Sequence, residues 1–581
     1  MERTHNNGEL RQINIGEKVT LIGWVSKRRN LGGLVFIDLR DRTGITQVVF
    51  DENVALQIKE VRNEYILQVE GIVNERKDKN DKLATGGIEV KAEKVLIINK
   101  AETTPIIIAD ETDALEDTRL KYRYLDLRRP IMQKKLFERA HITRVMRRYL
   151  EDNGFIEVET PILTASTPEG ARDFLVPSRV HPGNFYALPQ SPQLFKQLLM
   201  VAGFERYFQV ARCFRDEDLR ADRQTDFTQV DIETSFLSEA EIQELMEKMI
   251  ARVMKEVKGI DIPLPLMKLP YVEAMNKYGS DKPDIRFEMQ LQDITSIFNT
   301  SEFVVFNTVD KQKGAIKALV VPNRADASRK EIDAYTELAK KHGSKGLVAI
   351  KYINQQLEGS AVKFFKEEEC QNLIEYLALK ENDLVLIAAG MWESTCNVLG
   401  ALRNHLKEEL KLYDPNAYAF LWVVDFPLLE YDEETKRYYA KHHPFTRPKE
   451  EDLPLLDSDP GAVKACAYDM VLNGFELGGG SLRIYDQQLQ SKMFKVLGFT
   501  PDQIKERFGW FIEAFQYGTP PHGGVAFGLD RIAMILTHSD SLRDVIAFPK
   551  TASASCLLTN APSVVDQKQL DELSIAIKFN D

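Results

Sequence analysis

The chain has 581 residues, of which 44% are hydrophobic and 28% are charged, with 32 glycines and 24 prolines. This composition excludes collagen-like, disordered and disulfide-scaffold proteins, and the length corresponds to roughly four domains of about 150 residues. Lysine and arginine number 76 against 88 acidic residues, so the net charge is −12. That charge alone argues against a nucleic-acid partner.

No feature of the sequence predicts export or membrane insertion. The first residues, MERTHNNGELRQ, are polar, unlike a signal peptide, and the apolar runs are far shorter than the roughly 18 residues of a bilayer span. The five cysteines form no C-x-x-C pair, so we expect no zinc site and a reducing cytoplasm. They are Cys213, Cys370, Cys396, Cys466 and Cys556.

Basic residues are concentrated in two places despite the acidic total. Between Arg119 and Arg148 there are eleven basic residues and two acidic ones, and a second group is Lys27-Arg28-Arg29. Salt screens charges beyond roughly 8 Å, so the distant acidic residues do not cancel a local basic patch. Such a patch could therefore steer a polyanion. The alternative is that they are the solvated faces of helices.

The N-terminal part predicts a small β-barrel. Five strand-like runs, at 19–25, 34–39, 45–50, 65–69 and 88–98, are separated by glycine-containing turns. A five-stranded barrel of this size binds oligonucleotides on one face. The acidic stretch Asp110–Asp117 predicts a linker into the basic segment.

The rest of the chain predicts a mixed α and β organisation with an insertion. Residues 131–152 have helical periodicity and end at Asn153-Gly154, and 239–257 predicts a second long helix. From Arg286 to about Pro415 the composition changes, which indicates an inserted domain of alternating strands and helices. Strand-like runs resume at Ala419.

The segment Phe214–Asp231 has nine charged residues among eighteen and apolar runs on both sides. Two strands joined by a long charged loop would direct alternate side chains into one cleft. The alternative is an exposed charged hairpin.

Two glycine-rich segments could contact a ligand. In Tyr468–Arg483, Asp469 and Glu476 could hold Mg²⁺, which takes oxygen ligands and substrate phosphates, or the segment could be a strand end with a glycine bulge. In Gly523–Arg531, glycines lead into a helix whose start could receive a phosphate. The Lys-Ser/Thr of a P-loop is missing there.

His442-His443 could be a metal pair or a surface pair. Adjacent side chains of an extended chain point to opposite faces, so two ligands to one metal are not expected. One histidine contacting a ligand is the favoured functional interpretation.

Three segments in this order resemble the motifs of class II aminoacyl-tRNA synthetases. They are Asn153–Pro161, Phe214-Arg-Asp-Glu217 and Gly528-Leu-Asp-Arg531. With the N-terminal barrel, the chain is similar to the aspartate, asparagine and lysine subgroup. Thr167–Gly170, Gln190–Lys196, His442-His443, Gly474–Arg483 and the insertion resemble its bacterial aspartate-charging family.

The resemblance implies an α+β multidomain fold. It has an OB-type anticodon-binding barrel, an antiparallel-sheet catalytic domain split by an insertion, and an inserted α+β domain. The predicted ranges are 1–104 for the barrel, 105–118 for a hinge, 119–285 and 419–581 for the catalytic domain, and 286–418 for the insertion.

The resemblance also implies an enzyme of protein synthesis that ligates aspartate to tRNA(Asp) through an aspartyl-adenylate. An acidic amino acid needs cations around its side chain, and arginine can bind a carboxylate with two hydrogen bonds. The residues expected to bind aspartate are Glu169, Ser191, Gln193, Lys196, Arg215, Asp231, His442, His443 and Arg483.

For ATP and its metal the resemblance assigns residues of the second and third motifs. Arg215 would meet the α-phosphate, Glu217 the adenine amino group and Arg531 the γ-phosphate, with Mg²⁺ on Asp469 and Glu476. Arg215 and Arg531 are thereby the expected catalytic residues. The further ATP-binding residues are Asp216, Gln224, Phe227, Glu476, Gly528, Leu529 and Asp530.

For tRNA the resemblance assigns barrel residues, namely Arg28, Leu31, Phe36, Gln47 and Glu89, and it implies a homodimer. Leu31 is more similar to members that charge tRNA(Asp) alone than to members that also charge tRNA(Asn). The open alternatives are a charging enzyme for asparagine or lysine, charging of tRNA(Asn) in addition, an ATP-dependent amidating enzyme on the same fold, and an RNA-binding paralogue without catalysis.

Overall fold

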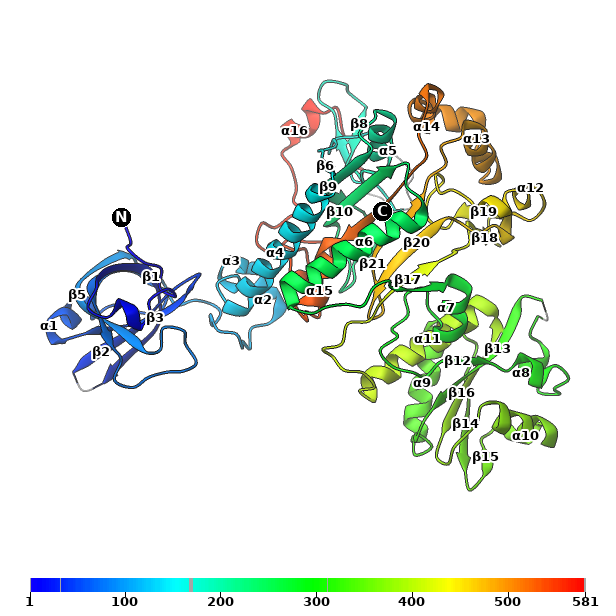
Figure 1. Cartoon of the computed structure of the whole chain (residues 1–581), viewed down its shortest axis with the longest axis horizontal. Helices are drawn as coiled ribbons and strands as arrows, with labels where there is room; N and C mark the ends of the chain where they lie inside the picture. Colours follow the sequence, from blue (N-terminus) through cyan, green and yellow to red (C-terminus); the bar gives the residue numbers. More distant parts are fainter. Residues whose placement is uncertain (1, 32, 167–170, 311, 579–581) are drawn as a thin grey trace. The chain divides into compact units, whose positions relative to one another are not determined.

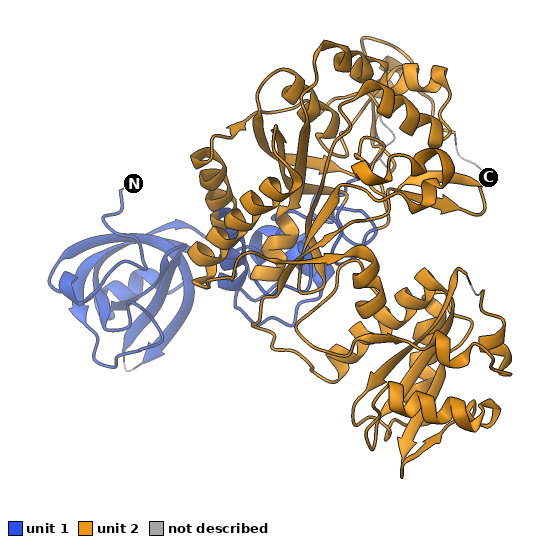
Figure 2. Cartoon of the chain, turned by 45° about the vertical axis from the view of Figure 1, so that its right-hand side comes forward, with its two compact units in different colours: residues 1–140, 219–224, 537–565 blue, residues 141–218, 225–536, 566–581 orange. Residues whose placement is uncertain are grey.

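The computed structural model describes residues 2–31, 33–166, 171–310 and 312–578. The chain divides into two compact units, coloured separately in Figure 2. Unit 1 consists of residues 1–140, 219–224 and 537–565, and unit 2 consists of residues 141–218, 225–536 and 566–581. Within the described residues, no helix is long and apolar enough to cross a membrane.

The N-terminal part of unit 1 is a closed barrel with the strand order β1-β2-β3-β5-β4 (Figure 1). Its strands are β1 (Lys18–Leu31), β2 (Leu34–Asp41), β3 (Gly44–Phe50), β4 (Ile66–Glu75) and β5 (Ile88–Asn99). The predicted five strands are therefore present, and the run at 88–98 forms the single strand β5. Alternate residues, such as Val19, Leu21 and Val25, fill the barrel core.

The α-helices that lie within unit 1 are short; α1 lies between β3 and β4, and α2 and α3 follow the barrel. They are α1 (Glu52–Ala55), α2 (Glu116–Lys121) and α3 (Arg123–Asp126), and α4 (Pro130–Asp152) runs on into unit 2. The buried carboxylate of Asp126 accepts hydrogen bonds from Arg119, Arg123 and Arg129. Three of the eleven basic residues in this segment therefore neutralise an internal acid instead of forming a solvated patch.

Unit 2 is built on an eight-stranded, mostly antiparallel sheet with the order β11-β17-β20-β21-β22-β10-β9-β6. Only the two edge pairs, β11 with β17 and β6 with β9, are parallel. The strands are β6 (Ile156–Glu157), β9 (Arg206–Phe214), β10 (Asp226–Ser235), β11 (Met267–Pro270), β17 (Phe420–Val424), β20 (Ala467–Leu472), β21 (Phe475–Leu482) and β22 (His522–Gly528).

Helices pack against this sheet, and two small hairpins complete this part of the unit. Those in contact with the sheet are α5 (Gln193–Val201), α6 (Glu239–Val253), α7 (Tyr271–Tyr278) and α15 (Leu529–Leu536). The other helices of this part are α12 (Leu455–Ser458), α13 (Gln487–Val496), α14 (Pro501–Ala514) and α16 (Gln567–Glu572). The hairpins are β7 (Leu175–Pro177) with β8 (Phe185–Ala187), and β18 (Leu429–Asp432) with β19 (Arg437–Ala440). The predicted helix at 239–257 is α6 followed by a π-helical turn, Met254–Lys258.

A second sheet, with the order β12-β13-β16-β14-β15, lies within the range predicted for the inserted domain. Its elements are β12 (Leu291–Asp293), β13 (Gly314–Val321), β14 (Val348–Ile353), β15 (Gln356–Glu358), β16 (Leu384–Met391), α8 (Val304–Asn307), α9 (Arg329–Lys341), α10 (Glu367–Tyr376) and α11 (Trp392–Glu409). Leu384 and Leu386 of β16 pack with α9 and α11, whereas Val385 and Ile387 face a second core with α8 and α10.

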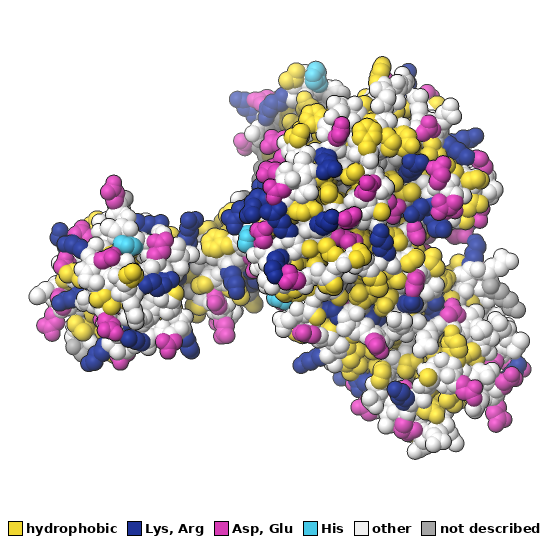
Figure 3. All heavy atoms as spheres, in the orientation of Figure 1, with side chains coloured by type: hydrophobic (Ala, Val, Ile, Leu, Met, Phe, Trp, Pro, Cys, Tyr) yellow, Lys and Arg dark blue, Asp and Glu magenta, His cyan; other side chains and the backbone are white. Residues whose placement is uncertain are grey.

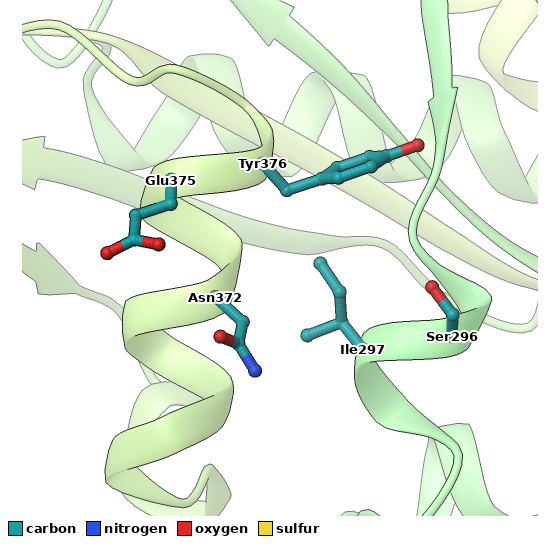
Figure 4. A pocket seen from close by; sticks show the side chains of 5 residues that line it. All are labelled: Ser296, Ile297, Asn372, Glu375 and Tyr376. Atoms are coloured by element: carbon teal, nitrogen blue, oxygen red, sulfur yellow. The ribbon is translucent and has the colours of Figure 1, made fainter.

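Hollows open among the described residues of the part that carries this second sheet. The smaller lies between α10 and a 3₁₀ turn at Thr295–Phe298, and Figure 4 shows Tyr376 and Ile297 on its opposite sides. The larger, of about 850 Å³, lies near α8 and the start of α11, and exposed Val304, Phe364 and Met391 are among its lining residues. On the face shown in Figure 3, positive and negative side chains are intermixed over this domain.

Candidate active site

The central strands of the large sheet place four charged side chains in its interior. Asp231 and Glu233 are two residues apart on β10, so both point to the same face, and they pair with Ala526 and Gly524 of β22. Lys196 comes from α5, and Arg483 follows β21 directly. All four side chains are almost completely buried.

These four groups form one ion-pair network. Lys196 Nζ lies 2.7 Å from Asp231 Oδ1 and 3.2 Å from Glu233 Oε2. Arg483 donates from Nε to Glu233 Oε1 at 2.9 Å and from Nη2 to Glu233 Oε2 at 3.1 Å. Glu233 therefore occupies the edge of the guanidinium formed by Nε and Nη2. Two positive charges balance two negative charges.

Neutral groups hold the other end of Arg483. Its Nη1 donates to Ser481 Oγ at 2.6 Å and contacts His443 Nε2 at 2.8 Å. Burial and then the charge of Arg483 lower the pKa of His443 well below its ordinary value, so the imidazole is neutral and can accept this hydrogen bond. His522, the first residue of β22, is also buried, and its Nε2 lies 3.0 Å from Oε1 of Gln197 in α5.

The two acids of the network differ in their ionisation. Burial raises the pKa of Asp231, and Lys196 only partly opposes this effect. Burial alone would also raise the pKa of Glu233, but the charges of Arg483 and Lys196 outweigh it and lower that pKa. Among the described residues, Asp231 Oδ2 has no hydrogen-bond partner. Asp231 is thus a buried acid with one oxygen available for a cationic ligand.

A second acidic pair lies on β20 and β21. Asp469 is opposite Gly479, and a β-bulge after Met470 places Glu476 beside Val471. A Cβ added at Gly479 would lie 2.5 Å from Asp469 Oδ1 and 3.4 Å from Glu476 Oε1, so the two carboxylates converge over this glycine. Burial and then the charge of Glu476 raise the pKa of Asp469 well above its ordinary value.

This pair suits a hard divalent cation. Asp469 Oδ1 is buried and has no hydrogen-bond partner among the described residues, and Glu476 Oε2 lies 4.0 Å from Arg531 Nη1. Mg²⁺ is bound by one or two carboxylates together with phosphate oxygens. No group of three or more potential ligands occurs among the described residues, so the protein itself would supply only part of the coordination shell.

His442 lies beside this pair. Its Nε2 is 3.9 Å from Asp469 Oδ1, and its ring packs edge-to-face on Phe426 with centroids 5.0 Å apart. Burial, followed by the charge of Lys441, lowers the pKa of His442 to about 4. The two histidines therefore reach different parts of the site, as expected for adjacent residues: His443 contacts Arg483 and His442 faces Asp469.

The second and third motifs meet on the same sheet. Arg215 stacks over the ring of Phe227 at 5.1 Å, across the β9–β10 hairpin. Asp530 Oδ2 accepts from the backbone N–H of Thr228 at 2.8 Å, and Arg531 Nη1 donates to the backbone oxygen of Glu476 at 2.7 Å. Gly528 ends β22 and Leu529 begins α15, so the third motif is a strand-to-helix junction.

The other predicted residues differ in their burial and in their contacts. Ser191 Oγ accepts from the backbone N–H of Gln193 at 3.3 Å, and Gln193 is buried. Asp216 and Glu217 follow β9 in the charged loop and are half-buried. Glu169 lies outside the described residues. Gln224 belongs to unit 1, where its amide exchanges hydrogen bonds with the backbone of Lys550 at 2.8 and 3.2 Å.

The glycines of the third motif region lead into a helix, as predicted, and two of them also make room in the sheet. Gly523 and Gly524 lie inside strand β22, which runs directly into α15. A Cβ on Gly524 would lie 2.0 Å from Glu233 Oε2 and 2.2 Å from the backbone oxygen of Ile232, so glycine makes room for the buried acid. Gly480 likewise allows β21 to approach β22.

Four residues in or around the ion-pair network were not predicted from the sequence, namely Glu233, Ser481, Gln197 and His522. The only available signal was alternation: Glu233 is two residues after Asp231 and Ser481 two before Arg483, which places each pair on one face of an extended chain.

The predicted anticodon residues lie on the barrel of unit 1. Gln47 Nε2 donates to Glu89 Oε2 at 2.8 Å, and Arg29 bridges Gln47 and Asp38. Phe36 pairs with Arg29 across the strands and is half-buried. Arg29, which was not predicted, therefore belongs to this face. By contrast, Arg28 donates to the backbone oxygens of Lys59 and Val61, and Leu31 is 63% exposed.

Known proteins similar to this chain agree in family. Residues 115–552 match the model described as tRNA synthetases class II (D, K and N), and residues 19–98 match the OB-fold nucleic acid binding domain. The aspartate–tRNA(Asp/Asn) ligase of Geobacillus sp. WCH70 is 58% identical over 99% of this chain and 98% of its own length. The aspartate–tRNA ligase of Geobacillus kaustophilus is 56% identical, over 99% of both chains.

Among solved structures, asparaginyl-tRNA synthetase from Pyrococcus horikoshii covers 94% of this chain and 97% of its own, with a TM-score of 0.58 and 20% identity. This likeness concerns the fold alone. It agrees with the predicted fold class, which is confirmed by the barrel and by the large antiparallel sheet. From the match over most of its length, the chain belongs to the class II aminoacyl-tRNA synthetases of the aspartate, lysine and asparagine group.

Proposed function

We propose that this protein ligates L-aspartate to tRNA(Asp) in two steps, through an aspartyl-adenylate. The single observation that carries the proposal is the buried pair of cations, Lys196 and Arg483. Asp231 and Glu233 already balance these two cations, and a ligand that carries both an ammonium group and a side-chain carboxylate adds one charge of each sign to the network. The aspartate-charging names of relatives that match over full length support the same substrate.

The network contains a complementary place for each charged group of aspartate. The Nη1–Nη2 end of Arg483 and the Nζ of Lys196 receive the side-chain carboxylate, with His442 and His443 beside it. The available oxygen of Asp231 receives the α-ammonium, together with Glu169, Ser191 and Gln193. Lysine would bring a further cation to Arg483, so charging with lysine is disfavoured electrostatically.

ATP binds over the β9–β10 hairpin and the third motif. Phe227 supplies an aromatic face for adenine, Glu217 accepts from its amino group, and Arg215 contacts the α-phosphate and the aspartate α-carboxylate. Arg531 holds the γ-phosphate from the strand-to-helix junction. Asp216, Gly528, Leu529 and Asp530 complete the predicted nucleotide site within unit 2.

Asp469 and Glu476 would hold Mg²⁺. When bound, the ion supplies positive charge to the phosphates of ATP. The protein contributes position and charge rather than a nucleophile. The aspartate α-carboxylate attacks the α-phosphorus and pyrophosphate leaves, and then a hydroxyl of the terminal adenosine of tRNA attacks the acyl carbon and AMP leaves.

The barrel of unit 1 supplies tRNA recognition. Phe36 stacks with an anticodon base, and the polar groups of Gln47 and Glu89 read base edges. Charging of tRNA(Asn) in addition is the second candidate, because the relatives from Geobacillus sp. WCH70 and Bacillus mycoides are named for both tRNAs. The enzyme acts as a homodimer in the cytoplasm, as its family resemblance implies.

A pyrophosphate-exchange assay with each of the twenty amino acids tests the substrate. We expect ATP–pyrophosphate exchange with aspartate and at most weak exchange with asparagine or lysine. Exchange with another amino acid, and none with aspartate, rejects the proposal. Charging purified tRNA(Asp) and tRNA(Asn) side by side then separates the selective enzyme from the relaxed one.

A further inference from the structure

The first turn of α11, in the inserted domain, is anchored to the part of unit 2 that carries the catalytic sheet. Trp392 Nε1 donates to Asn276 Oδ1 at 2.8 Å, and the buried Lys317 of β13 donates to the same oxygen at 2.9 Å. Asn276 belongs to α7, which begins at Tyr271 and directly follows β11 of the large sheet. Two donors from the insertion thus converge on one amide of α7.

The next residue of α11, Glu393, reaches a cluster beside His442. The Tyr271 hydroxyl donates to Glu393 Oε1 at 3.4 Å, and Lys441 Nζ lies 4.0 Å from the same oxygen. The Lys441 ammonium also lies over the Tyr271 ring, 5.5 Å from its centroid, and pairs with Glu430. The insertion thereby places a carboxylate next to the residue that precedes His442.

From this cluster, packing contacts continue to His442. The rings of Tyr271 and Phe426 are 5.3 Å apart, and Phe426, which is buried, meets the His442 ring edge-to-face. Among the described residues, His442 Nδ1 has no hydrogen-bond partner, and its Nε2 is 3.9 Å from Asp469 Oδ1. The orientation of the imidazole therefore depends on packing against Phe426 more than on hydrogen bonds.

We infer that Glu393 is a positioning residue through which the inserted domain orients His442 in the aspartate site. The carboxylate fixes the Tyr271 hydroxyl and attracts the Lys441 ammonium. Tyr271 in turn fixes Phe426, and Lys441 fixes the start of the His442–His443 segment. This inference rests on the proposed function, in which these histidines lie beside the substrate carboxylate. It gives the insertion a role in amino-acid binding.

Kinetics of single and double variants test this role. The side chain of Glu393 is 53% exposed, so its loss should have a modest effect. Because exposed pairs are weak, we expect Glu393→Ala and Tyr271→Phe each to raise the KM for aspartate about 3-fold in pyrophosphate exchange. The KM for ATP and kcat should stay unchanged. Glu393→Gln, which keeps an acceptor for the Tyr271 hydroxyl, should restore part of the affinity.

The double variant and a control distinguish a specific positioning role from a non-specific destabilisation of the fold. If both residues act along one route, Glu393→Ala with Tyr271→Phe should raise the KM no further than the larger single effect. Asn404→Ala, at an exposed position of the same helix, should change nothing. Equal changes in the KM values of ATP and aspartate, additive effects, or unaltered single variants overturn the inference. Failure of the wild-type protein to exchange with aspartate instead overturns the proposed function.

Discussion

Arg483 donates hydrogen bonds to three different side chains, so its guanidinium is held before any substrate binds. Glu233 takes two of these bonds, and Ser481 and His443 take the others. Arg483 is therefore orientated by Glu233 and Ser481, which have no substrate role in the proposal, together with His443. Because the guanidinium is already held in place, substrate binding costs less side-chain conformational entropy.

A lysine cannot reproduce this geometry. In Arg483→Lys the charge remains, but the paired hydrogen bonds to Glu233 and the end facing the substrate are lost. Since hydrogen bonds to charged groups contribute about 1.5–3 kcal/mol, we expect kcat/KM for aspartate to fall roughly 10- to 150-fold. Steady-state pyrophosphate exchange measures this effect. ATP affinity should be unchanged, and an equal loss of ATP affinity would contradict the assignment of Arg483 to the amino acid.

At the residue scale, the sequence allowed prediction of the groups that carry a motif but not of those that support them. Lys196, Asp231 and Arg483 were predicted, and the structure joins them in one network. Glu233, Gln197 and His522 were missed. Their role depends on strand register and on helix α5 packing against β10, which a single sequence does not specify.

Among the elements, strands β10, β21 and β22 pack closely because β21 and β22 have glycines, which lack a side chain, at the positions of contact. In Gly524→Ala the added methyl group would meet Glu233 and the backbone of Ile232 at about 2 Å. We expect an unfolding free energy lower by about 1–3 kcal/mol, because the strands or the acid must shift. Aspartate-dependent exchange should fall as well, since Glu233 orientates Arg483.

Gly509→Ala is the matched control. Gly509 lies in helix α14, and a Cβ there would meet only Lys505 Cγ, at 3.7 Å. Alanine is favoured over glycine in a helix by up to about 1 kcal/mol, so this variant should be as stable as the wild type or more stable. Thermal and denaturant unfolding measure the stability of both glycine variants, Gly524→Ala and Gly509→Ala. If the two glycine variants behaved alike, the close-packing argument would be wrong.

The junction of the inserted domain is held by a buried acid, Asp284. Arg286 donates to it at 2.7 and 3.0 Å, and Lys407 of α11 at 2.8 Å. Burial alone would raise the pKa of Asp284, but these hydrogen bonds and charges outweigh it and lower the pKa to about 2. The ionised form is therefore favoured in the folded state.

This shift gives a pH-dependent prediction. A depressed acid pKa contributes stability that is present above the unfolded-state value of about 3.9 and is lost as pH falls through about 2. Asp284→Asn should therefore lower the unfolding free energy by about 2 kcal/mol near neutral pH. The difference from the wild type should shrink as pH falls below about 4. Denaturant unfolding at several pH values checks this, and a constant difference would contradict it.

Elements with strong periodicity were predicted well, whereas the conformation of the glycine-rich segment before α15 was not specified. The predicted helix at 131–152 is α4, Pro130–Asp152, because its apolar residues repeat at helical spacing. Gly523 and Gly524 were expected to lead into a helix, and they do so as part of a central strand. A glycine in a strand and a glycine in a loop leave the same local signal, and only the neighbouring strand distinguishes them.

For the whole molecule, the proposed tasks are divided between the barrel and the large sheet. Phe36→Ala removes the aromatic face of the barrel, and stacking contributes about 1–3 kcal/mol per base. We expect the KM for tRNA(Asp) to rise on the order of 10-fold, whereas pyrophosphate exchange without tRNA stays unchanged. Comparing the two assays on one preparation checks this. A loss of exchange would show that Phe36 supports the fold instead.

The organisation of the whole chain could be predicted because each part has its own pattern. Five short strands, three motifs in order and a change of composition indicated a barrel, a catalytic sheet and an insertion, and the family match confirms the class. The assignment of Gln224 to unit 1 could not be foreseen, because the segment 219–224 groups with residues 537–565, which are distant in sequence.

The most direct test of the central claim is a crystal structure with a non-hydrolysable aspartyl-adenylate analogue. The account predicts the side-chain carboxylate of the analogue within hydrogen-bond distance of Arg483 and Lys196, its ammonium at Asp231, and its adenine against Phe227. A carboxylate bound elsewhere, with Arg483 still paired only to Glu233, Ser481 and His443, would contradict it.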